Sequence, residues 1–324
     1  MPYEKPTLKK FEAKEKYDYI FKQFKGAGFK IKEYPELYER CVELANMPES
    51  HFDDAVKMSE IIDILWDEIE KEDNIRFSLE ELKLACLFHD IGKSGPVGAD
   101  RNQRFMIQQI FNPIYFNINS EQFKKAPQFN GKNLKEKKTL MRDLSIKEIL
   151  DIESFQNKDK IADYLSTLEV HAFDEEKQRI IKQKLDINKH RMIDLWREHD
   201  YWTFDLLNAH GNKNISRELI VVSSSHHTLE GHDPAMIDGK LPNEAIALET
   251  LDKYLILTLV DKYQAFIDRE GVNHEETIKI LRNIVDKSKK EKRFGANERI
   301  YDQFNKYIDL FDKHPEMAEI ITKK

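Results

Sequence analysis

Apolar residues recur every three or four positions along most of the chain, the spacing that gathers them on one face of an α-helix. Ser50, Ser78 and Ser216 precede such patterns and are predicted N-caps, because a serine hydroxyl accepts a hydrogen bond from a first-turn backbone N–H. The alternation typical of a strand is suggested only at Leu219–Val222, which fits a helix as well. We therefore predict an all-α fold, with further helices over residues 34–45, 146–155, 160–168, 190–209 and 244–269 and two or three after 275.

The helical pattern weakens in the middle of the chain. Residues 97–185 are rich in Asn, Gln and Lys, but their interspersed aromatic residues argue for an ordered insertion. Gly92 and the Gly95–Pro96 pair are predicted to end the helix before it. Five segments result: an N-terminal helical extension (1–44), a first core half (45–96), the insertion as a lid or specificity wall (97–185), a second core half (186–272) and C-terminal helices (273–324).

Composition narrows the classes of partner. The net charge of −7 argues against nucleic acid as a partner. Neither Cys41 nor Cys86 has a CxxC partner, so no disulfide framework is expected, and Cys86 is predicted to be a buried small hydrophobe. The polar start lacks a signal-peptide core, and no apolar run approaches the roughly 18 residues needed to cross a membrane. We expect a cytoplasmic protein with a small-molecule partner, whose C-terminal helices pack on the core or on a second copy in a homodimer.

One histidine–aspartate pair differs from the others in the residues that flank it. His89–Asp90 closes an apolar helix and is followed by Lys93. An imidazole and a carboxylate are costly to bury unless something satisfies them, and a divalent cation does so by taking N and O ligands together. Asp90 could present one oxygen to each of two ions, and Lys93 could neutralise a phosphate oxygen. The dipeptide occurs twice more without this setting, as His199–Asp200 and His232–Asp233.

The segment Leu87–Lys93, which reads LFHDIGK, resembles the hallmark of the HD-domain superfamily of metal-dependent phosphohydrolases. This resemblance implies an all-helical bundle whose ligands run His, then His-Asp, then Asp. His51 matches the first ligand, one helix upstream. Asp261 matches the last, and a carboxylate in so apolar a helix needs a partner. No Glu stands one turn before His51, where Met47 lies, so the resemblance does not extend to a third ion.

The segment from His226 to Pro234 is similar to the His-His-Glu and Asp-Gly-x-Gly-Tyr-Pro motifs of the HD-GYP branch. His199 stands where that branch has another ligand. Thr228 and Glu230 depart from the motif, which leaves open whether cyclic di-GMP is a substrate. The resemblance implies two ions: one held by His51, His89, Asp90 and Asp261, the other held or flanked by Asp90, His199, His226 and His227. The remaining histidines outside this segment are interpreted as surface residues: His171, His190, His210, His274 and His314.

The resemblance implies hydrolysis by a metal-activated water. Mixed His and carboxylate ligation favours Fe, Mn, Co, Ni or Zn over Mg. Asp90 would bridge the ions, Lys93 would stabilise charge on the phosphoryl group, and His232 would protonate the leaving oxygen. We expect a phosphodiesterase or phosphatase acting on a nucleotide or cyclic (di)nucleotide. The alternatives are a di-iron oxygenase on the same fold and a catalytically degenerate signalling or binding module.

Overall fold

The computed structural model describes residues 10–47, 50–71, 77–116, 120–152, 155–174, 179–211, 214–227, 229, 248–294 and 298–322. The predicted all-α fold is confirmed, and the sheet within these ranges is a single two-stranded hairpin. The elements before the predicted insertion are α1 (Lys10–Gly26), η1 (Ile31–Glu33), α2 (Pro35–Ala45), α3 (His51–Ile69), α4 (Leu79–Phe88) and the 3-10 helix η2 (Ile91–Ser94).

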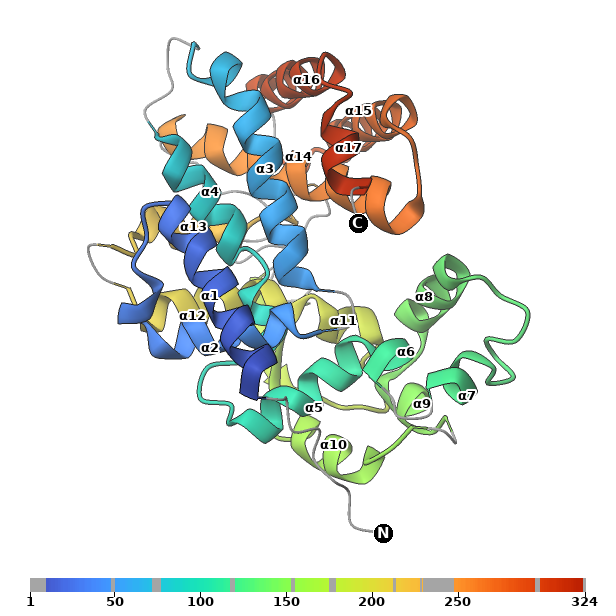
Figure 1. Cartoon of the computed structure of the whole chain (residues 1–324). Coiled ribbons are helices and arrows are strands. Elements are labelled where there is room, and N and C mark those ends of the chain that lie inside the picture. Colours follow the sequence, from blue (N-terminus) through green and yellow to red (C-terminus); the bar gives the residue numbers. More distant parts are fainter. Residues whose placement is uncertain are drawn as a thin grey trace.

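The middle of the chain forms the hairpin and several short helices, and Figure 1 shows these helices beside the larger bundle. A second hydrophobic core, separate from the main one, gathers side chains between Ile107 and Trp202, and most of them come from residues 97–185. The limits of the five predicted segments stay predictions. The elements are α5 (Arg101–Phe111), α6 (Pro113–Phe116), α7 (Ser120–Lys124), α8 (Leu134–Asp143), α9 (Ile146–Leu150), α10 (Lys158–Leu165), β1 (Glu169–Asp174) and β2 (Arg179–Lys184).

The second half of the chain completes the bundle around one long helix. α14 contacts α3, α4, α13 and the three helices that follow it, and its apolar residues Leu255 and Leu259 are fully buried. The predicted helix over 244–269 is thus present from residue 248, and its first four residues lie outside the described ranges. The elements are α11 (Met192–Trp196), α12 (Glu198–Ala209), α13 (Arg217–Ser223), α14 (Leu248–Glu270), α15 (His274–Lys290), α16 (Glu298–Asp312) and α17 (Met317–Thr322).

The predicted serine caps are confirmed. Ser50 Oγ accepts from the backbone N–H of Asp53 at 3.1 Å, and Ser216 Oγ accepts from that of Leu219 at 3.1 Å. Ser78 forms a full capping box, because the side chain of Glu81 also accepts from the Ser78 N–H. These caps fix the starts of α3, α4 and α13, which are helices next to the candidate site.

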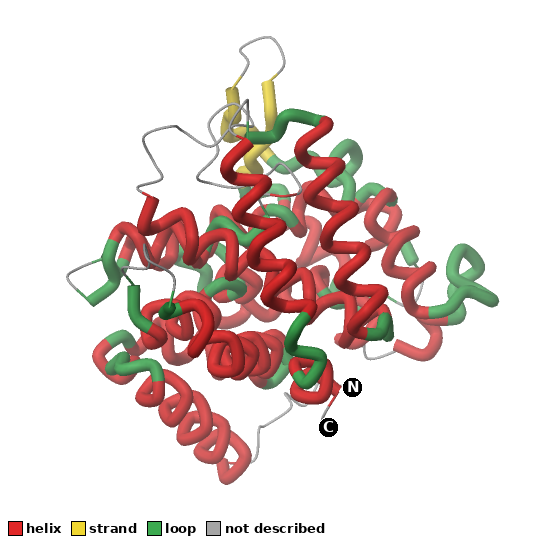
Figure 2. The backbone as a smooth tube through the Cα atoms, turned by 90° about the horizontal axis from the view of Figure 1, so that it is seen from above, coloured by secondary structure: helices red, strands yellow, loops and turns green. Residues whose placement is uncertain are grey.

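The hairpin was not predicted. β1 and β2 pair antiparallel from Glu169 with Lys184 to Asp174 with Arg179, and they project from the helices in Figure 2. The stretch considered as a strand, Leu219–Val222, lies instead within α13. A two-stranded hairpin is marginal alone and depends on packing against a neighbour, so its sequence signal is weak.

The end of α4 differs from the prediction. The helix ends at Phe88, before Gly92, and the chain turns through His89 and Asp90 into η2. Gly95, with φ of +109°, closes η2, so a glycine does end this region. Gly92 instead lets η2 approach α12 closely.

Two further expectations can be compared with the structure. Cys41 and Cys86 are buried and form no disulfide, as predicted, and burial raises the pKa of both thiols. No helix within the described ranges is both long and apolar enough to cross a membrane.

Candidate metal centre

The predicted ligands come from five parts of the bundle and meet at its centre. Their side chains are buried, apart from one that is half-buried. His232, the predicted proton donor, lies outside the described residues. His51 begins α3, His89 and Asp90 join α4 to η2, His199 is the second residue of α12, His226 and half-buried His227 follow α13, and Asp261 lies within α14.

Asp90 lies in the middle of these side chains, and its two carboxylate oxygens face different groups. Oδ2 is 3.4 Å from His89 Nε2 and 3.9 Å from His51 Nδ1. Asp261 approaches from α14, with its Oδ1 3.9 Å from His89 Nε2. We call His51, His89, Asp261 and Asp90 Oδ2 the first side of the centre.

The other oxygen of Asp90 faces a tighter group. Oδ1 is 3.3 Å from His199 Nε2 and 3.6 Å from His226 Nε2, and these nitrogens are 3.2 Å apart. Asp200 adds its Oδ1 at 3.0 Å from His199 Nε2 and 3.5 Å from His226 Nε2. We call His199, Asp200, His226 and Asp90 Oδ1 the second side. His227 flanks it, since one ligand atom of each of His199, Asp200, His226 and His227 lies within 4.8 Å of the others.

These spacings fit a metal ion. Imidazole and carboxylate ligands lie about 2.0–2.2 Å from a transition metal, so two ligands of one ion are about 3.0–3.5 Å apart. The measured pairs of the second side lie 3.0 to 3.6 Å apart, close to this range, and those of the first side lie 3.4 to 3.9 Å apart, somewhat wider. Asp90 Oδ1 is buried and accepts no hydrogen bond from the described residues, which is costly without a cation nearby. Two groups of these residues could each hold a metal ion by the spacing of their ligand atoms: His199, Asp200, His226 and His227, and His89, Asp90 and His226.

Three imidazoles are oriented in the same way. His89, His199 and His226 each direct Nδ1 at the backbone oxygen three residues earlier, at 2.7, 2.5 and 3.2 Å. A carbonyl oxygen can only accept, so Nδ1 carries a proton in each ring, and in the neutral ring Nε2 keeps its lone pair. Each Nε2 faces the centre. Metal-binding histidines use this arrangement, in which an outer hydrogen bond fixes the tautomer and the ring.

The pKa values of His226, Asp90 and Asp261 suit ligand roles, whereas His89 holds its proton more strongly than a free imidazole does. Burial lowers the pKa of His226 to about 4, so this ring is neutral at pH 7. Burial also acts to lower the pKa of His89, but Asp90 and Asp261 outweigh it and raise that pKa above its usual value. Burial acts to raise the pKa of Asp90, yet Lys93 and His89 hold it well below the usual range. The pKa of Asp261 is likewise lowered. Metal binding needs ionised carboxylates and neutral imidazoles.

Two lysines border the centre, Lys93 beside the first side and Lys262 between Asp261, whose Oδ2 is 3.5 Å from its Nζ, and His227. The Lys93 ammonium donates to Asp90 Oδ2 and lies 3.5 Å from His51 Nδ1. The predicted basic residue therefore reaches the centre, where it contacts Asp90 itself. Lys262, which the sequence did not single out, has its Nζ 3.1 Å from His227 Nδ1. A positive charge thus lies near each end of the cluster.

A close approach between η2 and α12 brings Asp90 beside His199. The Gly92 N–H donates to Thr203 Oγ1 at 2.9 Å, and that hydroxyl donates to the His89 carbonyl at 3.1 Å. A Cβ on Gly92 would lie 2.0 Å from the His199 carbonyl oxygen. Only glycine permits this approach.

Arg40, a fully buried residue of α2, fixes the far end of η2. Its guanidinium donates to Ser94 Oγ at 3.0 Å, the Gly95 carbonyl at 2.9 Å and the Pro96 carbonyl at 3.0 Å. Glu36 accepts from the same group at 2.9 Å. Because Asp90 immediately precedes η2, Arg40 helps to position Asp90 without touching it.

The sequence analysis missed two carboxylates near the centre. Asp200 belongs to a His-Asp pair set aside as uninformative, although its neighbour His199 was a predicted ligand. Glu198, fully buried, accepts from the backbone N–H of His171 at 2.7 Å and lies 2.9 Å from its Nδ1. This pair attaches β1 to the start of α12. His171 is therefore half-buried, as are the other four histidines expected at the surface.

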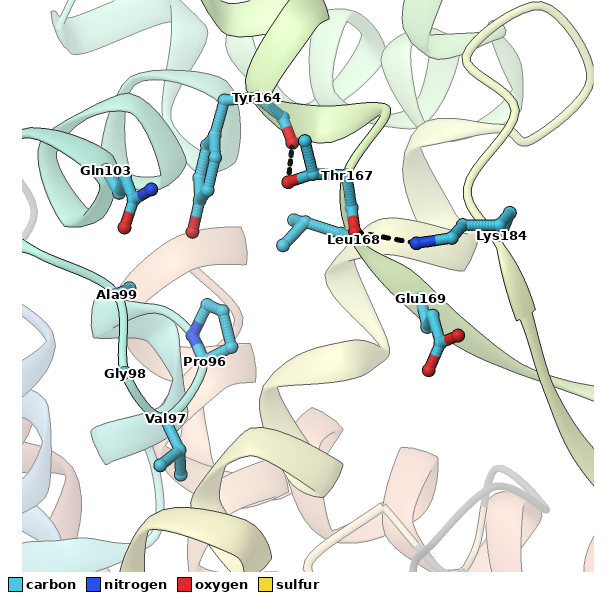
Figure 3. A pocket seen from close by; sticks show the side chains of 10 residues that line it. All are labelled: Pro96, Val97, Gly98, Ala99, Gln103, Tyr164, Thr167, Leu168, Glu169 and Lys184. Carbon is cyan, nitrogen blue, oxygen red and sulfur yellow. Dashed lines mark hydrogen bonds between the residues drawn. The ribbon is translucent and has the colours of Figure 1, made fainter.

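A hollow of about 420 Å³ lies on the insertion, between the segment after η2 and the junction of α10 with β1 (Figure 3). Pro96, Leu168 and the ring of Tyr164 form apolar parts of its lining, and Glu169 and Lys184 add charge. None of its lining residues is a predicted ligand, so the hollow is separate from the metal centre. The role of residues 97–185 as a lid or specificity wall stays a prediction.

Comparison with known proteins adds no further assignment. No protein-family model matches the sequence, and neither a curated protein nor a solved structure matches the chain. What the protein does has to be inferred from the chemistry of the site, since a fold alone does not specify a function.

Proposed function

We propose that this protein is a metal-dependent phosphohydrolase, a phosphodiesterase or phosphatase that acts on a nucleotide or cyclic (di)nucleotide. The observation that carries the proposal is the division of the ligands between the two oxygens of Asp90. A carboxylate placed between two groups of ligands suits a pair of ions, the arrangement of many phosphoester hydrolases. The chain order His51, His89–Asp90, Asp261 further supports a relation to the HD-domain superfamily.

Two divalent ions fit the donor set. When bound, they would supply a hydroxide at neutral pH and neutralise charge on the phosphoryl group. Mixed imidazole and carboxylate donors favour Fe, Mn, Co, Ni or Zn over Mg. The first ion would be held by His51, His89, Asp90 and Asp261, and the second by Asp90, His199 and His226 with His227 beside it.

The protein's own residues supply position and charge. Lys93 lies against Asp90 and His51, so its ammonium is near the proposed ions and can attract a phosphoryl oxygen. The η2 segment that carries it is fixed by Arg40 at one end and by the Gly92–Thr203 contact within it. A fixed charge costs little reorganisation when negative charge develops during the reaction. His232 remains the proposed proton donor to the leaving oxygen.

The test is a substrate and metal screen. Mono- and dinucleotides and bis(p-nitrophenyl) phosphate would be incubated with the protein loaded with Mn, Fe or Co. Hydrolysis is expected with at least one metal, and Asp90→Ala and His89→Ala should lose about 10³-fold or more of it. Asp205→Asn, an exposed change on α12, is the control that should keep full activity. Absence of hydrolysis with every metal, or unchanged rates in Asp90→Ala, would refute the proposal.

The histidine-rich ligand set also fits a second candidate, a di-iron oxygenase. Five histidines and a shared carboxylate suit iron that reacts with oxygen as well as they suit a hydrolytic ion. The two functions differ in their requirements. Turnover that needs both iron and O₂, and that Mn or Zn cannot support, would favour the oxygenase. Turnover that continues without O₂ would favour hydrolysis, and none at all would favour a degenerate binding module.

A further inference from the structure

We propose that Asp200 is a direct ligand of the second ion, so that this ion has two carboxylate and two imidazole donors. The proposal rests on the metal centre of the proposed function and names a ligand that the sequence pattern does not supply. Asp200 is fully buried in α12, next to His199. Its Oδ1 is 3.0 Å from His199 Nε2 and 3.5 Å from His226 Nε2.

The tautomers of His199 and His226 determine whether these rings can donate a hydrogen bond to Asp200. The Nδ1 atoms of His199 and His226 face backbone carbonyl oxygens, so these nitrogens carry the protons. In the neutral rings that a metal ion requires, each Nε2 then presents a lone pair to the Asp200 carboxylate and has no proton to donate to it. An acceptor that faces another acceptor at 3.0 Å is repulsive unless a cation lies between them.

The same repulsion between acceptors applies to all four donors of the second side. The distances among His199 Nε2, His226 Nε2 and the Oδ1 atoms of Asp90 and Asp200 run from 3.0 to 3.6 Å in the pairs given above. These five distances match the spacing of neighbouring ligands on one divalent ion.

A ligand role for Asp200 makes the two sides of the centre alike. The first side offers His51, His89, Asp90 and Asp261, and the second offers the same two-plus-two donor set. Two divalent ions with three carboxylates would carry a net charge of about +1, because Asp90 is shared between them. That leaves positive charge to attract an anionic substrate, with the two lysines beside it. Equal donor sets also predict that both sides take the same metal.

The experiment counts ions in the full-length protein, so it does not depend on activity. Wild type, Asp200→Asn and Asp205→Asn would be loaded with Mn²⁺, and bound metal would be measured by mass spectrometry and by titration. Asp205 lies on the same helix with an exposed side chain, which matches the change of charge. We expect two ions in wild type and Asp205→Asn, and about one in Asp200→Asn, with the lost site weakened about 100-fold or more. Two ions bound to Asp200→Asn with unchanged affinity would overturn the proposal.

A second variant distinguishes the loss of a metal ligand from misfolding. Asp200→Glu keeps a carboxylate one methylene longer and should bind more metal than Asp200→Asn, with a changed absorption spectrum when loaded with Co²⁺. A spectrum identical to that of wild type would show that residue 200 does not touch the ion. Failure of the wild-type protein to bind any ion would overturn this inference and the proposed function together. A wild type that binds two ions but hydrolyses nothing would overturn the proposed function alone.

Discussion

The two sides of Asp90 use the same kinds of residue but differ in how tightly they are assembled. The second side holds its donor atoms 3.0 to 3.6 Å apart, and two of its imidazoles are fixed by backbone carbonyls. The first side is wider, at 3.4 to 3.9 Å, and Lys93 contacts its shared carboxylate oxygen. An ammonium there competes with a metal ion for Asp90 Oδ2. The second side is therefore better prepared for an ion than the first.

The difference has a structural cause. The second side depends on α12, which lies against η2 through Gly92 and Thr203. The first side depends on α14 and α3, which are joined near the centre by the hydrogen bond from Gln264 Nε2 to Asp54 Oδ1 at 2.8 Å. The closer contact of backbone with backbone gives the second side its shorter distances. The following predictions test this comparison.

Asp90→Asn should have the largest effect on metal binding and hydrolysis, because Asp90 is the one residue assigned to both sides of the centre. The amide cannot bridge two cations as a carboxylate does, so both ions should be lost and phosphoester hydrolysis should fall about 10³-fold or more. Metal content and steady-state kinetics measure this. If Asp90→Asn kept one ion at normal affinity, Asp90 would serve one side only and the comparison would be wrong.

Gly92→Ala should affect the second side more than the first, because the substitution disturbs the packing between η2 and α12. The added Cβ would meet the His199 carbonyl at 2.0 Å, so η2 and α12 must move apart. We expect a loss of about 3 kcal/mol or more in the free energy of unfolding, and the second ion should weaken more than the first. Denaturant unfolding and Mn²⁺ titration measure both effects. Gly26→Ala is the control, since nothing lies within 4 Å of its added Cβ, and it should be neutral.

Lys93→Met should affect the first side in two opposite ways. Removal of the ammonium frees Asp90 Oδ2 and His51 Nδ1, so the first ion should bind about tenfold more tightly. Hydrolysis should nevertheless fall about 100-fold, because the charge that attracts the phosphoryl group is lost. Lys57→Met, on α3 and paired with Asp268, should change neither quantity. Weaker binding of the first ion in Lys93→Met would mean that the lysine supports the metal.

Acid should release the first ion before the second. The pKa of His89 is raised, so a metal ion on the first side must displace a proton near neutral pH. Affinity there should fall about tenfold per pH unit below that pKa. His226 has a pKa of about 4 and stays neutral, so its protonation should not weaken the second side at pH 5.5. Mn²⁺ titrations between pH 5.5 and 8 measure the order, and the reverse order would contradict the comparison.

The same shifts predict the stability of the metal-free protein, with opposite signs for the two histidines. His226, whose folded pKa lies below its unfolded value, loses its contribution as the pH falls from about 6.5 towards 4. His89, whose folded pKa is raised, contributes below about 6.5 and loses that contribution as the pH rises through the folded value. His226→Asn should flatten the acid limb of a plot of unfolding free energy against pH. An unchanged acid limb would show that His226 is not neutral in the folded state.

Much of the helical framework could be predicted from local pattern. The serine caps and the apolar ridge of α14 are local features, and period-3.6 spacing reveals them. The short helices α5 to α8 and the β1–β2 hairpin were missed because a second core stabilises them, and that core joins residues far apart in the chain. Polar residues scattered among the aromatic residues of this second core interrupt the 3.6-residue spacing of apolar positions.

The sequence by itself identified the chemical types of the centre, because buried histidine and aspartate need partners wherever they lie. It also identified Asp90 as a residue able to face two ions. The family resemblance implied the two ligand groups, but only the tertiary structure decided the distances within them and the place of Asp200, since a crossing of helices, unlike a spacing along one of them, sets distances between residues more than a hundred positions apart. Asp200 and Gly92 acquire their importance in this way: neither is unusual in the chain, and both matter because α12 lies against η2.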